Sequence, residues 1–294
     1  MKNKHIIWII LAAALIIILG TYLYTVNPGT SDENDTSGTS YTSTSPSPSN
    51  PVRLIFIHHS VGESWLSDEE GGLGIALRDN NYFVSDTYYG WGPDDIGDST
   101  DIGNWWDWFR GPESSNILNA LYEESSQNSD YSRLSTNPGG ENEIIVFKSC
   151  YPNSDLRGDP DDPVPSIDNN PLKSQDYNSE YHTVANAKGI YIDLLEYFKT
   201  RQDKLFIVVT APPLSEPANA DNARVFNQWL VNDWLKDYPY DNVAVFDYYS
   251  ILTNGGNKLA YSSGDDYPNA EGQQKATEEF VNFLNNAYNQ WKNG

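Results

Sequence analysis

The chain has 294 residues and a net charge of −23, with 41 acidic residues against 18 basic ones. Such an acidic surface repels phosphate backbones, which argues against nucleic acid as a partner. The single cysteine excludes an intrachain disulfide and a cysteine-rich metal site, so stability must come from packing.

The first residues predict a membrane anchor. Residues 6–24 carry no charge and follow Lys2 and Lys4, and about 20 apolar residues suffice to span a bilayer. The positive end should stay in the cytoplasm, so residues 1–25 would be a single-pass anchor with the remainder outside the cell. The alternative is a cleaved signal peptide and a secreted protein, although no small-x-small cleavage pattern follows the apolar run.

Residues 26–51 consist almost wholly of Ser, Thr, Pro, Gly, Asn and Asp. Such a segment cannot bury enough apolar surface to fold, so it is interpreted as a disordered linker. Residues 52–294 are long enough for one α/β domain with a full core.

The domain begins with a short apolar run. Residues 52–57 are apolar except for Arg53, which is typical of a parallel strand buried on both faces. His58, His59 and Ser60 follow directly, at the strand edge where open α/β folds bind ligands. Ser60 is therefore a candidate functional residue, with capping of the next helix as the alternative.

The next segments are a helix expected near residues 72–78 and a strand at 82–86. Residues 88–109 mix tryptophans with aspartates and glycines and show no periodicity, so they predict a long ordered loop. Aromatic faces beside carboxylates suit a sugar ring; the alternative is that the tryptophans seal the sheet edge. The candidate ligand contacts are Trp91, Trp105 and Trp106. Calcium held by the aspartates is a weaker alternative, because their spacing does not match an EF-hand loop.

Further strands alternate with helices. Strands are expected at 143–149, 204–210 and 242–247, and helices at 116–124, at 185–202, from Asp221 to Lys236, and after Asn269 as an N-cap. This alternation predicts a five-stranded parallel sheet covered on both faces by helices.

Two polar residues follow the strand at 143–149. Cys150 is either a nucleophile or, more simply, a buried thiol, since no cation directly adjoins it in the sequence. Asn153 carries an amide that can donate to a developing oxyanion.

Taken in order, these blocks resemble the SGNH/GDSL hydrolase superfamily. The resemblance rests on Ser60 in H-H-S-V-G, Gly90 in Y-Y-G-W-G, Asn153 in C-Y-P-N-S and the P-N-A-E-G run before the last helix. It covers essentially residues 52–294 and implies a flavodoxin-like three-layer α/β/α sandwich. It further implies an esterase in which Ser60 attacks an ester while Gly90 and Asn153 stabilise the oxyanion, with no cofactor and no metal.

The final block departs from the family pattern. In the family a histidine precedes P-N-A-E-G, with an aspartate three residues earlier; here these positions hold Tyr267 and Gly264. A phenol ordinarily titrates near pH 10 and is a poor general base at neutral pH. Replacement bases are His182, His58 or a carboxylate such as Asp266, and the remaining possibility is a site that binds without cutting.

The sequence thus favours an extracellular, membrane-tethered serine esterase acting on acylated polysaccharide, with Tyr267 among the substrate contacts. The first alternative is a catalytically inactive relative that binds glycans. The second is a cell-surface scaffold that uses the fold without a small ligand.

Overall fold

The computed structural model describes residues 45–294. The expected membrane helix at 6–24 and most of the expected linker lie outside the described residues. Within residues 45–294, no helix combines the length and apolar character needed to cross a bilayer.

Five parallel strands form one sheet, which confirms the predicted sheet. They are β1 (Val52–Ile57), β2 (Tyr82–Thr87), β3 (Ile144–Lys148), β4 (Leu205–Val209) and β5 (Val243–Phe246). Their order is β2-β1-β3-β4-β5, the order of flavodoxin-like doubly wound sheets. The connections reverse direction between β1 and β3, and such folds bind ligands beyond the carboxyl ends of the strands at this switch point.

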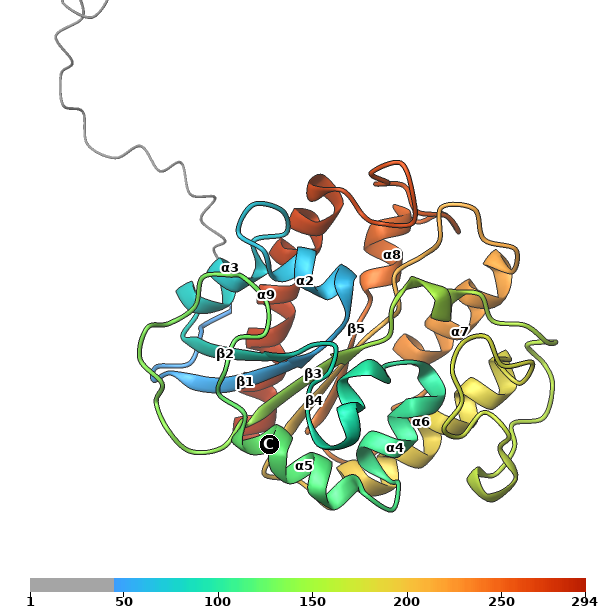
Figure 1. Ribbon diagram of the computed structural model, residues 1–294, viewed down its shortest axis with the longest axis horizontal. Coiled ribbons are helices and arrows are strands. Elements are labelled where there is room, and N and C mark those ends of the chain that lie inside the picture. The colour runs from blue at the N-terminus through green and yellow to red at the C-terminus, as the bar shows by residue number, and fades with distance from the viewer. Residues whose placement is uncertain (1–44) are drawn as a thin grey trace, which may run out of the picture. The chain divides into compact units, whose positions relative to one another are not determined.

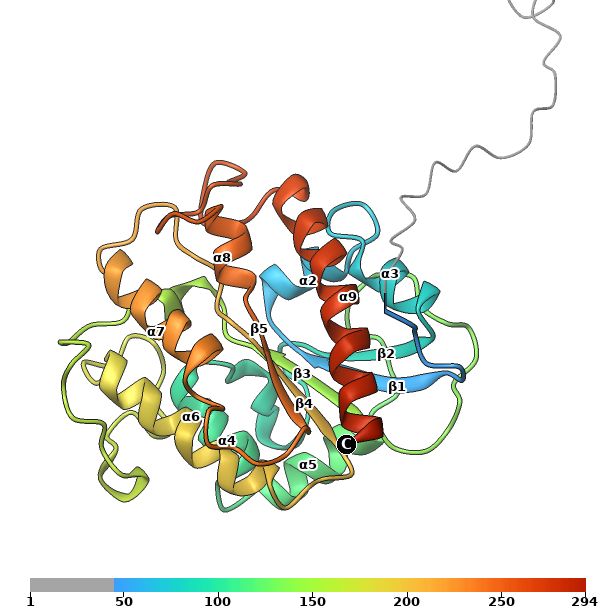
Figure 2. The ribbon, with the colours of Figure 1, turned by 180° about the vertical axis from the view of Figure 1, so that it is seen from behind.

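Helices cover both faces of the sheet (Figures 1 and 2). One layer holds α2 (Ser60–Leu66), α3 (Leu73–Asp79), α8 (Tyr248–Thr253) and α9 (Ala270–Asn293). The other layer holds α4 (Trp105–Phe109), α5 (Ser114–Glu123), α6 (Val184–Phe198) and α7 (Ala220–Asn232). Short 3-10 helices η1 (Pro93–Asp98), η2 (Ile102–Asn104), η3 (Tyr151–Ser154) and η4 (Ile167–Asn169) lie in the connections.

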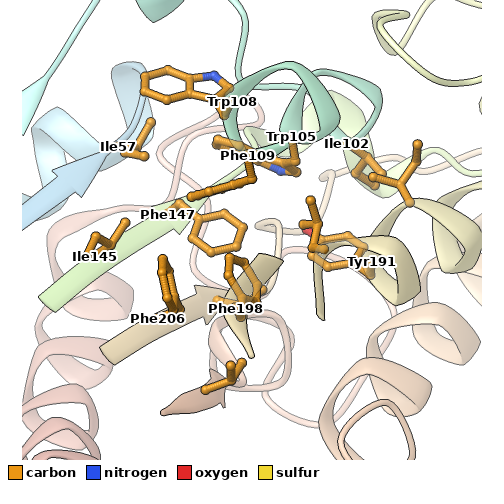
Figure 3. Close-up of a cluster of buried hydrophobic side chains, with 14 of the residues drawn as sticks. Ile57, Ile102, Trp105, Trp108, Phe109, Ile145, Phe147, Tyr191, Phe198 and Phe206 are labelled. Atoms are coloured by element: carbon orange, nitrogen blue, oxygen red, sulfur yellow. The ribbon is translucent and has the colours of Figure 1, made fainter. Parts of the chain in front are cut away.

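The side chains of β1 show why the strand is apolar apart from Arg53. Leu54 and Phe56 join the core beneath α9, whereas Ile55 and Ile57 join the core beneath α4 and α6. Alternate residues of a strand point to opposite faces, so a strand covered on both sides must be apolar at every position. Figure 3 shows the second core, in which Ile57 lies near Phe147 and the aromatic residues of α4.

The aromatic segment 88–109 is more regular than predicted. It contains η1, η2 and α4, and the indole of Trp105 in α4 is fully buried against Phe147. The tryptophans contribute large buried areas, and this packing orders a segment that shows no periodicity in sequence.

Two helix predictions need correction. Helix α7 ends at Asn232, before Lys236, and begins at Ala220 after Asn219. Asp221 therefore lies inside the helix, and its carboxylate accepts a hydrogen bond from Asn257 (2.8 Å) instead of capping. The short helix α8 was not predicted from the sequence.

The end of the expected linker packs on the domain. The carbonyl of Pro46 accepts a hydrogen bond from Asn289 in α9, and the carbonyl of Pro48 accepts one from Asn81, both at 2.8 Å. Pro46 and Pro48 thus contact the domain through backbone carbonyls, which composition does not reveal.

The N-terminus of α9 is capped as predicted. The side chain of Asn269 accepts a hydrogen bond from the Gly272 N–H at 3.0 Å. We expect Asn269→Ala to lower the free energy of unfolding by about 1 kcal/mol, because one helix N–H loses its partner. Urea unfolding should show this loss, and Asn282→Ala, in the middle of the same helix, is the matched control with a change of less than about 0.5 kcal/mol. An equal loss in both variants would contradict the capping role.

Candidate functional site

A cavity of about 780 Å³ opens at the carboxyl end of β1, between α2, the turn before α9 and the start of α9. Both views place α2 beside the N-terminal half of α9 (Figures 1 and 2). The lining is rich in hydroxyl and carboxylate groups, among them those of Ser60, Glu63, Ser64, Glu70, Asp265 and Tyr267.

Ser60 lies on the wall of this cavity as the first residue of α2. Its Oγ accepts a hydrogen bond from the Tyr267 hydroxyl at 2.9 Å and lies 4.0 Å from Cys150 Sγ. Gly62 is required nearby, since a Cβ at this position would overlap the side chain of His58. The nucleophile position implied by the resemblance thus faces a phenol.

The turn before α9 holds Tyr267 in place. The Tyr267 N–H donates to Asp265 Oδ1 (2.9 Å), and its carbonyl accepts from the N–H and the hydroxyl of Ser263 (both 3.0 Å). The Tyr267 ring packs edge-on against Tyr151, with centroids 5.6 Å apart. The phenol is therefore oriented toward Ser60 by its own turn and by a neighbouring ring.

Two predicted bases are engaged elsewhere. His182 is buried, its Nδ1 contacts the Asp155 carbonyl at 3.3 Å, and its Nε2 has no hydrogen-bond partner. Burial lowers the pKa of His182 to about 4, so this imidazole is neutral at ordinary pH. Asp266 accepts hydrogen bonds from the N–H and the hydroxyl of Ser215 (2.7 and 2.5 Å). The structure therefore places neither His182 nor Asp266 in contact with Ser60. Each of these side chains instead contacts a loop residue, Asp155 or Ser215.

His58 forms a buried pair with Asp86. Its Nε2 lies 3.2 Å from Asp86 Oδ2, and its Nδ1 lies 3.0 Å from the carbonyl of His59. Both ring nitrogens of His58 therefore have partners other than Ser60. Neither nitrogen is directed at the Ser60 hydroxyl.

Both ring nitrogens of His59 also have partners other than Ser60. Its Nε2 donates to the carbonyl of Gly97 (2.6 Å), its Nδ1 lies 3.1 Å from the Thr100 hydroxyl, and its ring stacks on Tyr89 at 4.1 Å. Burial lowers the pKa of His59 to about 4, so the ring is neutral. Within residues 45–294, no imidazole hydrogen-bonds Ser60.

The proposed oxyanion donors also have other partners. The Gly90 N–H donates to Asp98 Oδ1 at 2.7 Å. The Asn153 amide donates to Asp101 Oδ1 (2.5 Å) and accepts from the Ile102 N–H (2.9 Å). Neither Gly90 nor Asn153 lines the cavity, so these contacts order the aromatic segment.

The tryptophans predicted to contact a sugar pack against protein. Trp105 is fully buried, and its Nε1 donates to Ser149 Oγ at 2.9 Å. Trp91 stacks on Trp108 with centroids 5.7 Å apart, and Trp106 lies under the ammonium of Lys173. The alternative that the tryptophans seal the sheet edge is favoured, and of the predicted ligand contacts Tyr267 alone lines the cavity.

Sequence reasoning missed a buried lysine close to the site. Lys148 ends β3, is 1% exposed, and donates only to the Ser149 carbonyl at 3.4 Å. Burial lowers the pKa of Lys148, and the charge of nearby Cys150 opposes this shift. Cys150 therefore lies two residues from a buried lysine amine, and this amine makes no hydrogen bond to Ser60.

The sequence reading also missed most acids of the cavity. Glu63 and Ser64 follow Ser60 by three and four residues, a spacing that places them on one face of a helix and that could have identified them. Asp130 comes from the connection after α5, and no local pattern marks it. Within residues 45–294, no group of three or more His, Cys, Asp or Glu side chains has the geometry of a metal site.

Comparison with family models and with curated proteins found no match. Among solved structures, the chain is similar to a family two carbohydrate esterase from Clostridium thermocellum in complex with cellohexaose. The identity is 12%, the TM-score is 0.38, and the match covers 83% of this chain and 66% of that one. The chain thus spans just under two thirds of that structure. This is a distant similarity of fold, and it carries no argument about substrate or mechanism.

Proposed function

We propose that the cavity beside Ser60 binds a hydroxyl-rich ligand, a glycan, and does not hydrolyse it. The observation that carries this proposal is the 2.9 Å hydrogen bond from the Tyr267 hydroxyl to Ser60 Oγ. A nucleophilic serine needs a base that accepts its proton. Here the group at the position of the base donates to the serine instead.

Two of the oxyanion donors implied by the resemblance have other partners in this structure. Removing a single donor from an oxyanion hole slows catalysis by roughly 100-fold to 1,000-fold. The Gly90 N–H and the Asn153 amide are bonded to Asp98 and Asp101. The engagement of these two donors, together with the lack of an imidazole beside Ser60 within residues 45–294, supports binding without turnover.

The lining suits sugar hydroxyl groups. Carboxylates of Glu63, Glu70 and Asp265 accept hydrogen bonds, while the hydroxyls of Ser60 and Ser64 both donate and accept. The ring of Tyr267 and the adjacent Pro268 offer apolar surface for the C–H face of a sugar. The volume of about 780 Å³ is that of an ordinary small-ligand site.

The test is hydrolysis by the full chain, purified in detergent. We expect p-nitrophenyl acetate and acetylated oligosaccharides to be hydrolysed no faster by the wild-type chain than by Ser60→Ala. We expect Tyr267→His to gain no activity either, because an added imidazole leaves the Gly90 N–H and the Asn153 amide bonded to Asp98 and Asp101. Calorimetric glycan binding should persist in Ser60→Ala and weaken at least tenfold, about 1.4 kcal/mol, in Tyr267→Ala.

A serine esterase acting on acylated carbohydrate is the second candidate function. The observation that favours it is the placement of Ser60, half-buried at the end of β1 and on the wall of the cavity. Turnover by the wild-type chain that disappears in Ser60→Ala would establish this candidate and overturn the binding proposal.

We further propose that the domain stands outside the cell, tethered by residues 6–24 through the linker. The uncharged run after Lys2 and Lys4 supports this topology. Protease added to intact cells should release the domain and leave the N-terminal segment in the membrane fraction. Protection from protease until the cells are lysed would contradict it.

A further inference from the structure

The cavity beside Ser60 is more acidic than the chain as a whole. Four of its twelve lining residues are acidic and none is Lys or Arg, whereas 41 of 294 residues in the chain are acidic. The acidic share of the lining is therefore more than twice that of the sequence. The acids are Glu63, Glu70, Asp130 and Asp265.

These carboxylates are not neutralised within residues 45–294. The ion pairs of the described chain involve none of the four. Glu63 accepts from the Tyr88 hydroxyl (2.6 Å) and Asp265 from the Tyr267 N–H (2.9 Å), which are neutral donors. The negative charge of these four carboxylates therefore acts on any ligand that enters the cavity.

The wall has hydroxyl donors but no cationic donor of Lys or Arg. The buried Gln273 lies behind it, and its amide nitrogen donates to Ser64 Oγ and to the Pro268 carbonyl (both 3.0 Å) and lies 3.4 Å from Glu70 Oε2. Its own Oε1 has no partner. One amide therefore supplies the donors for three wall residues, and acceptors remain in excess on this side of the cavity.

We propose that the ligand is an amino sugar, a glycan whose free amino groups carry positive charge and face the four carboxylates of the wall. This inference rests on the proposed glycan-binding function and names its ligand class. An ammonium group supplies the positive charge that the wall lacks together with N–H donors for its carboxylates, and such charge-assisted hydrogen bonds are stronger than neutral ones. The same carboxylates repel uronic acids and sugar phosphates, which gives specificity by exclusion.

Three matched ligands isolate the charge. Tetrasaccharides of β-1,4-linked glucosamine, N-acetylglucosamine and glucose share one backbone geometry and differ at carbon 2, which bears an ammonium, an acetamido or a hydroxyl group. Calorimetry on the full chain at about pH 6, below the ordinary pKa of an amino group, should give about tenfold tighter binding for glucosamine. At about 1 M salt, where the Debye length falls to about 3 Å, most of this preference should disappear.

Variants that each remove one negative charge test which wall carboxylates contribute to the preference for the amino sugar. Glu70→Gln and Asp130→Asn should each reduce the preference for glucosamine over the glucose tetrasaccharide by about threefold, since each removes one charge at nearly constant shape. Glu216→Gln is the matched control, because Glu216 pairs with Lys258 and does not line the cavity. It should leave the preference unchanged.

The outcomes separate the two proposals. Equal affinity for the three tetrasaccharides would overturn the amino-sugar inference and leave glycan binding in place. Binding of none of them would remove the proposed function as well. A linear polyamine that binds as tightly as the glucosamine tetrasaccharide would also overturn the inference, because charge alone would then explain the affinity.

Discussion

Asp86→Asn is expected to lower the free energy of unfolding by about 3–5 kcal/mol, the cost of breaking a buried ion pair from one side. Both carboxylate oxygens of Asp86 accept, Oδ1 from the Asn128 N–H and the Tyr131 hydroxyl, Oδ2 from His58 and the Ser129 hydroxyl. An amide has one oxygen, so in either orientation its NH₂ group would face donors. His58 Nε2 would also lose its carboxylate partner.

Urea unfolding of the full chain measures this loss. Glu271→Gln is the matched control, because it breaks the exposed pair with Lys275 on the surface of α9 and should cost less than about 0.5 kcal/mol. A loss below about 1 kcal/mol for Asp86→Asn would show that the buried pair contributes little.

The same carboxylate makes stability depend on pH. Burial alone raises the pKa of Asp86, but the hydrogen bond and charge of His58 and the bonds from Asn128 and Ser129 outweigh it and hold the pKa below its usual value. A lowered folded-state pKa contributes stability above the unfolded-state value of about 3.9, and this stability is lost as pH falls through the folded-state pKa. The wild-type chain should therefore lose stability more steeply than Asp86→Asn below about pH 4.

Trp65→Ala should also cost about 3–5 kcal/mol, the range for removing a large aromatic side chain from a core. Trp65 is fully buried in α2, stacks on Tyr248 with centroids 4.5 Å apart, and packs edge-on against Phe280 at 5.2 Å. Its Nε1 donates to Thr277 Oγ1 at 2.9 Å. One indole thus joins α2, α8 and α9, and of these helices α2 and α9 line the cavity.

Thermal or urea unfolding checks this prediction, with Tyr240→Ala as the comparison. Tyr240 is 44% exposed, so its removal should cost less than about 1 kcal/mol. Similar losses for both variants would mean that Trp65 packs less tightly than its contacts indicate.

The sheet was predictable from the sequence because each strand carries a local signal. The runs 54–57, 144–147 and 205–209 are continuously apolar, as is typical of strands buried on both faces. The helices after them show a 3.6-residue period or a cap such as Asn269. The observed helix boundaries differ from the predicted ones by a few residues, as in α7, where several polar residues can start the same helix.

The candidate site was only partly predictable, because its decisive contacts join distant parts of the chain. Ser60 and Tyr267 were both singled out, and they meet across 207 residues. His182 was considered as a base because its loop follows a strand, but its Nδ1 contacts the Asp155 carbonyl instead. The pairing of His58 with Asp86 depends on β1 and β2 lying side by side, which no local pattern specifies.

The central claim is that the cavity of Ser60 and Tyr267 binds a glycan and leaves it intact. Native mass spectrometry of the full chain, incubated with an O-acetylated glucosamine oligosaccharide, tests binding and cleavage together. We predict a complex that contains the ligand at its unaltered mass and that is lost in Tyr267→Ala. Absence of the complex, or loss of acetyl groups that requires Ser60, would contradict the account.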